Sequence, residues 1–286
     1  MNRQPKNNNP NEILAYLLAI IIALVVLCLL ASLVLLIVKL ALPAQTPQDT
    51  QTEETTTQAD AAVSLTPEDV ILAQTADAGM EYIEKMIFFG ESTTAHLSRS
   101  GGVLDTDENR RQVWNNASNT RKLDSRLATQ TFYYYNADGT REEVDLPTAV
   151  TREQPEYMVL SFGLNGIIGF IGNKTMYLNA YRNLINEIQT ASPNTKIILQ
   201  SVYPVCRADN YSVDVETLNE YIRTLNEWLL ELAADYENVR YADTASVLTD
   251  GNGMLKSQYD SSGDGIHLTN AAYQEILYYL RTHAWQ

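Results

Sequence analysis

Hydrophobic and polar positions divide this 286-residue chain into three parts. Residues 13–38 carry no charged side chain, and almost all of them are apolar. As a helix rising 1.5 Å per residue, this run would reach roughly 39 Å, more than the ~30 Å hydrocarbon core of a bilayer. The pattern therefore predicts one tilted transmembrane helix over residues 13–38.

A cleaved signal peptide is the alternative interpretation of this run. The run is too long for a signal peptide, and Leu42 stands where a cleavage site needs a small side chain. Arg3 and Lys6 precede the run, whereas only Lys39 follows it before an acidic stretch. This bias predicts a single-pass protein of the cell membrane, with residues 1–12 in the cytoplasm and the bulk of the chain outside.

A polar stretch separates the apolar run from the rest of the chain. Residues 43–63 are rich in Thr, Gln, Asp and Glu and have almost no large apolar side chains. Such a composition cannot bury enough apolar surface to fold, so we predict a disordered linker over residues 39–63. Residues 64–286 are enough for one domain with a well-buried core.

Short apolar runs alternate with segments of helical character through residues 64–286. The apolar runs predict buried strands at residues 86–89, 157–162, 196–202 and 238–241. Helical spacing and capping signals predict helices at residues 64–85, 93–99, 173–190, 213–236 and 270–283. The alternation predicts a three-layer α/β domain in which helices cover both faces of a mostly parallel sheet.

Two further segments stand out from this alternation. Residues 129–146 contain two β-prone runs around Asp138-Gly139, which predicts a hairpin insertion. Its tyrosines, Tyr133–Tyr135, are expected to pack on the hairpin face, with stacking on sugars as the alternative. Glycines at every third position from Gly163 to Gly172 predict a flexible loop over the candidate site described below.

Charge and cysteine content narrow the range of partners. The net charge of −15 repels phosphates, so nucleic acid is excluded as a partner. The two cysteines, Cys28 and Cys206, are not expected to form a disulfide, because Cys28 lies inside the apolar run. The histidines His96, His267 and His283 have no cysteine neighbours at zinc-ligand spacing, so neither a metal nor an organic cofactor is expected. His96 and His283 are interpreted as structural or surface residues.

Four polar residues carry the candidate chemistry. Ser92 follows the first predicted strand and Asn165 the second, so both belong to the edge where parallel strands end and ligands bind. A serine needs a base to remove its proton, and a histidine held by a carboxylate is suited to this. His267 and Asp264 are three residues apart and could come from one short loop. The backbone N–H of Ser92 and the amide of Asn165 could then stabilise an oxyanion.

The segments around these residues resemble three sequence blocks of the SGNH/GDSL hydrolases. They are Gly90-Glu91-Ser92, Gly163-Leu164-Asn165 and Asp264-Gly265-Ile266-His267, within a resemblance that covers roughly residues 84–283. It implies a flavodoxin-like α/β/α sandwich in which Ser92 is the nucleophile. His267 would be the base, Asp264 its orienting carboxylate, and Asn165 an oxyanion donor. Glu91 stands where the family usually has aspartate.

The second block of the family normally supplies a glycine whose N–H serves the oxyanion. The matching stretch, Trp114 to Thr120, lacks glycine. Asn119 tolerates a left-handed backbone better than most residues, so its N–H is the candidate third oxyanion donor.

The expected function is that of a serine esterase outside the membrane. Its expected substrate is an ester on a small molecule or an envelope glycan, such as an O-acetyl group. The same chemistry with a sugar hydroxyl as acceptor would make it an O-acyltransferase. A different alternative is a non-catalytic extracellular module that binds glycan or protein. In that case Ser92 would only cap a helix, Asn165 form a turn, and His267 be a structural histidine.

Overall fold

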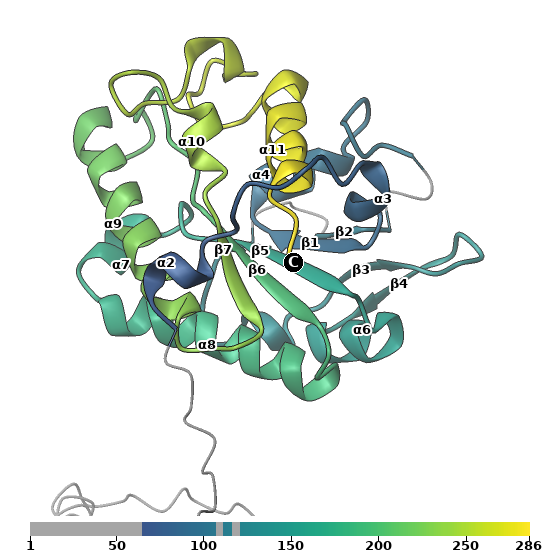
Figure 1. The fold of residues 1–286 in the computed structure, drawn as a ribbon. Helices are drawn as coiled ribbons and strands as arrows, with labels where there is room; N and C mark the ends of the chain where they lie inside the picture. The colour runs from purple at the N-terminus through teal and green to yellow at the C-terminus, as the bar shows by residue number, and fades with distance from the viewer. Residues whose placement is uncertain (1–64, 107–110, 116–120) are drawn as a thin grey trace, which may run out of the picture. The chain divides into compact units, whose positions relative to one another are not determined.

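A parallel sheet forms the centre of this computed structural model, which describes residues 65–106, 111–115 and 121–286 (Figure 1). Within these residues the sheet has five strands in the order β2-β1-β5-β6-β7. Their bounds are β1 (Met86–Gly90), β2 (Val113–Trp114), β5 (Tyr157–Ser161), β6 (Lys196–Gln200) and β7 (Val239–Ala242). Every neighbouring pair is parallel. This is the flavodoxin-like order 2-1-3-4-5, and the predicted fold class is confirmed.

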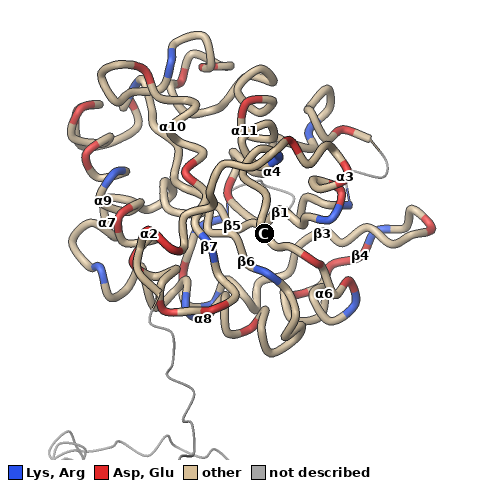
Figure 2. Tube along the Cα trace, in the orientation of Figure 1, with Lys and Arg blue, Asp and Glu red and all other residues tan. Residues whose placement is uncertain are grey.

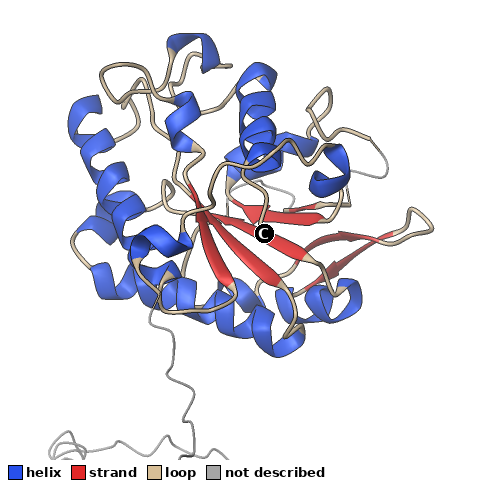
Figure 3. Cartoon of the chain, viewed as in Figure 1, coloured by secondary structure: helices blue, strands red, loops and turns tan. Residues whose placement is uncertain are grey.

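Helices cover both faces of the sheet, so the domain has three layers (Figure 3). The longer helices are α6 (Leu146–Glu153), α8 (Lys174–Ala191), α9 (Val215–Ala233) and α11 (Asn270–Thr282). The shorter ones are α2 (Pro67–Val70), α3 (Met80–Ile83), α4 (Ser92–Ala95), α7 (Ile167–Ile171) and α10 (Ala245–Leu248), with 3₁₀ turns η1 (His96–Ser98), η2 (Leu127–Thr129) and η3 (Ser257–Tyr259). Acidic residues occur on helices of both outer layers (Figure 2).

Alternate residues of each strand enter two separate cores. On β1, Phe89 packs with the cluster that includes α6, α8 and α9, whereas Phe88 packs with the cluster that includes α3 and α11. All five residues of β1 and of β5 are buried. Strands covered on both faces have continuous apolar sequences, and this explains why the sequence predicted them.

The predicted helix over residues 64–85 is not continuous. It begins as expected, because Thr66 and Asp69 form a capping box at the start of α2. After Val70 the chain becomes extended, and Ile71 forms a parallel bridge with Tyr241 on the edge strand β7. Hydrogen bonding to this otherwise open strand edge replaces the middle of the expected helix.

The segment between Gly163 and Gly172 also differs from expectation, because α7 occupies its centre where a flexible loop was predicted. Ile167 and Phe170 are buried and anchor this short helix in the core. The hairpin is confirmed as β3 (Phe132–Tyr135) and β4 (Arg141–Val144), which pair antiparallel.

Residues 1–64, 107–110 and 116–120 lie outside the described residues. The predicted cytoplasmic segment 1–12, transmembrane helix 13–38 and linker 39–63 fall there, as does Asn119. Among the helices of the described part, none combines the length and apolarity that crossing a bilayer requires.

Candidate active site

Ser92 lies at a tight junction between β1 and α4. Glu91 is the N-cap residue and Ser92 the first residue of the helix, so Ser92 is not the capping residue. Gly90 permits the junction, because a Cβ atom there would lie 2.6 Å from the carbonyl oxygen of Ser161. The junction therefore holds the serine at the carboxyl end of the sheet.

A continuous hydrogen-bonded chain joins Ser92, His267 and Asp264. His267 Nε2 lies 3.0 Å from Ser92 Oγ, and His267 Nδ1 lies 2.6 Å from Asp264 Oδ2. The side chains of His267 and Asp264 are 27% and 30% exposed, so a substrate has access to them. This arrangement can remove the serine proton while the carboxylate fixes the imidazole tautomer.

Hydrogen bonds within the loop 264–267, and one from Cys206, fix the position of the base. Asp264 Oδ1 accepts the backbone N–H groups of Ile266 at 2.9 Å and His267 at 3.0 Å. Partial burial alone would raise the pKa of Asp264, but the hydrogen bonds from His267 and Ile266 hold it well below its ordinary value. Outside the loop, the N–H of Cys206 donates to Gly265 O at 3.0 Å. Asp264 therefore remains ionised at neutral pH.

Asn165 reaches the same edge because β1 and β5 pair in register, with Gly90 opposite Ser161. Its side-chain amide donates one hydrogen bond to the carbonyl of Arg121, at 2.9 Å. An amide nitrogen has two hydrogens, so this bond orients the group and leaves a second N–H for an oxyanion.

Glu91 links the loop after β1 to the loop after β5. Its carboxylate accepts the N–H of Gly163 at 2.6 Å and the N–H of Asn165 at 3.0 Å. The side chain is only 4% exposed. Burial raises the pKa of Glu91 to about 7, against the two hydrogen bonds that lower it. The residue next to the serine thus fixes the backbone of the oxyanion candidate.

His96 contacts the candidate base, which its interpretation as a structural or surface residue did not foresee. Its ring lies 4.6 Å from the His267 ring, at an angle of 33°. Arg99 Nη1 lies 3.3 Å from His96 Nδ1. Burial, with the charges of His267 and Arg99, lowers the pKa of His96 to about 4, so the ring is neutral. A sequence signal existed, because residues four apart on a helical segment share a face and His96 is four residues after Ser92.

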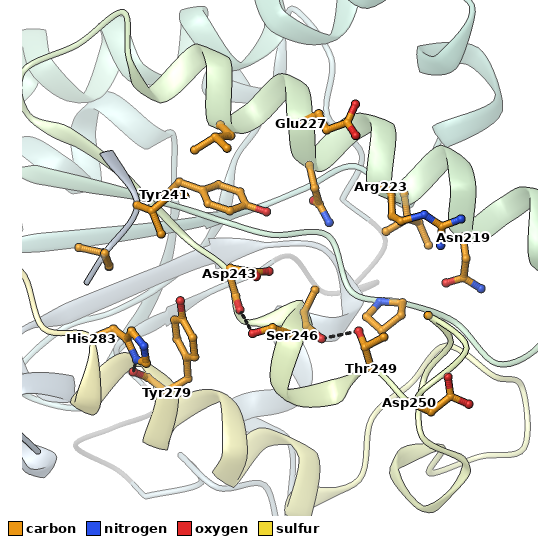
Figure 4. A pocket seen from close by; sticks show the side chains of 18 of the residues that line it. Asn219, Arg223, Glu227, Tyr241, Asp243, Ser246, Thr249, Asp250, Tyr279 and His283 are labelled. Carbon is orange, nitrogen blue, oxygen red and sulfur yellow. Dashed lines mark hydrogen bonds between the residues drawn. The ribbon is translucent and has the colours of Figure 1, made fainter. Parts of the chain in front are cut away.

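A cavity of about 740 Å³ lies elsewhere, between α9, α10 and α11 (Figure 4). Figure 4 shows Asp243, Ser246 and Tyr279 around it. Burial raises the pKa of Asp243. None of the four candidate residues lines this cavity, so the candidate chemistry lies outside it. In the described ranges, no group of acidic, histidine or cysteine side chains is arranged to hold a metal ion.

Comparisons with known proteins agree with the sequence blocks. The sequence profile of the GDSL-like lipase/acylhydrolase family matches residues 88–275. Among curated proteins, none matched the chain.

Solved structures with similar folds include three bacterial proteins. A DUF4886 family protein from Bacteroides uniformis is 12% identical, with 69% of this chain and 82% of that one covered and a TM-score of 0.46. A GDSL-like lipase from Bacteroides thetaiotaomicron is 18% identical, with 72% and 88% covered and a TM-score of 0.43. An acetylxylan esterase from Geobacillus stearothermophilus is 12% identical, with 76% and 98% covered and a TM-score of 0.43. At these scores, the likeness carries no conclusion about substrate.

Proposed function

We propose, from the premise that the chain belongs to the GDSL-like lipase/acylhydrolase family, that it cleaves its ester through an acyl-enzyme on Ser92. The observation that carries this proposal is the hydrogen-bonded chain from Ser92 through His267 to Asp264. Family membership makes the protein an acylhydrolase, and the hydrogen-bonded chain supports the residues proposed for each step.

In the first step, His267 Nε2 takes the proton of Ser92 as its oxygen attacks the carbonyl carbon. Asp264 stabilises the imidazolium that forms. The imidazolium then gives its proton to the departing alcohol as the C–O bond breaks, which leaves the acyl group on Ser92. In the second step, His267 takes a proton from water, the resulting attack releases the acid, and Ser92 regains its proton.

The negative oxygen of each tetrahedral intermediate needs donors. The N–H of Ser92 and the second amide N–H of Asn165 are the proposed donors, with the N–H of Asn119 as a third. Each such donor is typically worth on the order of 10²–10³ in rate. Asn165 suits this role because Glu91 fixes its backbone and Arg121 its amide.

The proposed substrate is an O-acetyl or similar ester on an envelope glycan outside the membrane. Support for this comes from the sequence, in which the apolar run 13–38 and its flanking charges favour a tethered domain on the outer side. An acidic domain has no attraction for anionic lipid headgroups, and this favours a glycan over a lipid ester.

A fluorophosphonate probe tests the proposal, because such probes form a bond with an activated serine. We expect the folded domain to be labelled, and Ser92→Ala to remove the label. Ser257→Ala is the control, because Ser257 is an exposed serine outside the hydrogen-bonded chain, and it should keep the label. Absence of label on well-folded wild-type protein would favour the non-catalytic binding module instead.

A further inference from the structure

We propose that a groove lined by Arg99, which contacts His96 next to the hydrogen-bonded chain, binds a carboxylate on the alcohol part of the ester, and that Arg99 recognises it. This inference rests on the proposed function and adds its substrate class, a carboxylate-bearing saccharide. The groove has a volume of about 290 Å³ and is open to solvent. Its lining includes Ser98, Arg99, Ser100, Asn115 and Tyr135.

Arg99 connects the groove to the catalytic base through His96. Arg99 lines the groove and its Nη1 lies 3.3 Å from His96 Nδ1, and the His96 ring lies 4.6 Å from that of His267. A sugar unit whose ester carbonyl reaches Ser92 would therefore place a neighbouring substituent within reach of the guanidinium.

Arg99 has hydrogen-bonding capacity to spare. Its guanidinium has five N–H donors. Among the described residues, its one side-chain hydrogen bond is to His96 Nδ1. It forms no ion pair with a carboxylate in the described ranges, in a chain with 35 acidic and 20 basic residues. A guanidinium binds a carboxylate in a two-pronged geometry that a lysine cannot reproduce. Within the described ranges, Arg99 therefore has donors free for a substrate carboxylate, a local positive charge in a protein whose net charge is negative.

The rest of the lining suits a sugar. Tyr135, from the end of β3, is half-buried and lines the groove, and a tyrosine ring can stack on a sugar face. Ser98, Ser100 and Asn115 provide hydroxyl and amide groups for sugar hydroxyls. The hairpin is fixed to the sheet here, because Tyr133 N donates to Asn115 O at 3.0 Å. One residue of the tyrosine run is thus available for stacking, whereas Tyr134 is buried.

Two matched esters test this inference. Phenyl acetate and 4-acetoxybenzoate share the acetyl group, but only the second carries a carboxylate on its leaving group. The quantity to measure is the ratio of kcat/KM for 4-acetoxybenzoate to that for phenyl acetate. We expect Arg99→Gln to lower this ratio about tenfold, mainly through KM, because one charge-assisted pair is lost. Arg99→Lys should keep part of the ratio, and added salt should lower it in the wild type.

Two control variants sharpen the result. Arg182→Gln should leave the ratio unchanged, because Arg182 lies on α8 and pairs with Asp235 at 2.9 Å. Lys122→Gln examines a second cation near the site, since the Lys122 side chain lies against Gly166, beside Asn165. The ratio should be insensitive to Lys122.

An unchanged ratio in Arg99→Gln would overturn the inference. If kcat/KM falls equally on both esters, Arg99 acts only through His96. If the ratio falls in Lys122→Gln instead, the anion binds elsewhere. If folded wild-type protein cleaves neither ester, the proposed function itself fails. If it cleaves both esters and Arg99→Gln does not change the ratio, only the inference about Arg99 fails.

Discussion

At the scale of single residues, His96 contacts the candidate base from outside the hydrogen-bonded chain. Its neutral ring lies against His267 at a tilt of 33° and limits the orientations that the imidazole can adopt. Its Nδ1 faces Arg99, so the proton of the neutral ring is on Nε2. We assign His96 as a positioning residue that acts through His267.

His96→Ala should lower kcat for an aryl acetate by roughly tenfold, because small displacements of a catalytic group are costly. His96→Phe keeps an aromatic face and should restore most of this loss. Steady-state kinetics with thermal unfolding of each variant would check the expectation. Equal kcat for the alanine variant and the wild type, or no recovery with phenylalanine, would contradict the positioning role.

Asn165→Ala should lower turnover by on the order of 10²-fold or more, because it removes one oxyanion donor. Asn165→Asp is an informative partner variant, since it keeps the size but puts negative charge where the oxyanion forms. It should be no better than alanine. Steady-state assays with 4-nitrophenyl acetate would measure the turnover of both variants. Unchanged turnover in Asn165→Ala would exclude Asn165 from the mechanism.

The sequence was informative about the residues that have a distinct chemical signature. Ser92, Asn165 and the Asp264–His267 pair could be named in advance, because only certain residue types in a certain order can supply a nucleophile, a donor and a base. Their roles stay predictions that kinetics must test. The hydrogen bonds of Glu91 could not be foreseen, because they depend on how two loops approach each other in space.

At the scale of elements, Glu91 joins the loops that follow β1 and β5. The Glu91 carboxyl titrates near neutral pH, so this link between the two loops depends on pH. Its pKa is about 7 in the folded protein and near the ordinary 4.5 when unfolded, so the folded state holds the proton more tightly. The stabilisation from this proton is fully present below pH 4.5 and is lost as pH rises through about 7.

Glu91→Gln removes this titration. Between pH 5 and pH 8, we expect the wild type to lose stability relative to Glu91→Gln by on the order of 2 kcal/mol, at about 1.4 kcal/mol per pKa unit. Urea unfolding of both proteins at the two pH values would measure the difference, and the other titrating groups cancel in the comparison. Parallel pH dependences would show that the Glu91 carboxyl is not perturbed.

Elements were predictable where local sequence decides the structure. The strands β1 and β5 are continuous apolar runs because both of their faces are buried. The segment after α2 was mistaken for helix because its partner, Tyr241, is more than 160 residues away in sequence. The two-residue strand β2 is too short to leave a pattern.

At the scale of the whole molecule, the strand order explains how distant segments meet. β1 and β5 are neighbours in the sheet, so the loops bearing Ser92 and Asn165 leave the same edge. The loop with Asp264 and His267 precedes α11, whose Tyr273 hydroxyl donates to Thr93 O at 2.6 Å. Motif spacing alone did not show this last contact, which ties the end of the chain to the helix of the serine.

The orientation of the chain in the membrane is a prediction at this scale. Protease added to intact cells should release a fragment that begins within residues 43–63, because that stretch is predicted to belong to an exposed linker. Mass spectrometry of the released fragment would identify its first residue. A domain that is cleaved only after the cells are lysed would contradict the predicted orientation.

The central claim is that Ser92 becomes acylated during turnover. Rapid mixing with 4-nitrophenyl acetate, an acid quench after milliseconds and peptide mass spectrometry would test it most directly. The account predicts an acetyl group on Ser92 in the wild type, and neither acetylation at that position nor appreciable hydrolysis in Ser92→Ala. Undiminished hydrolysis by Ser92→Ala, or turnover by the wild type with no acetyl group on Ser92, would contradict it.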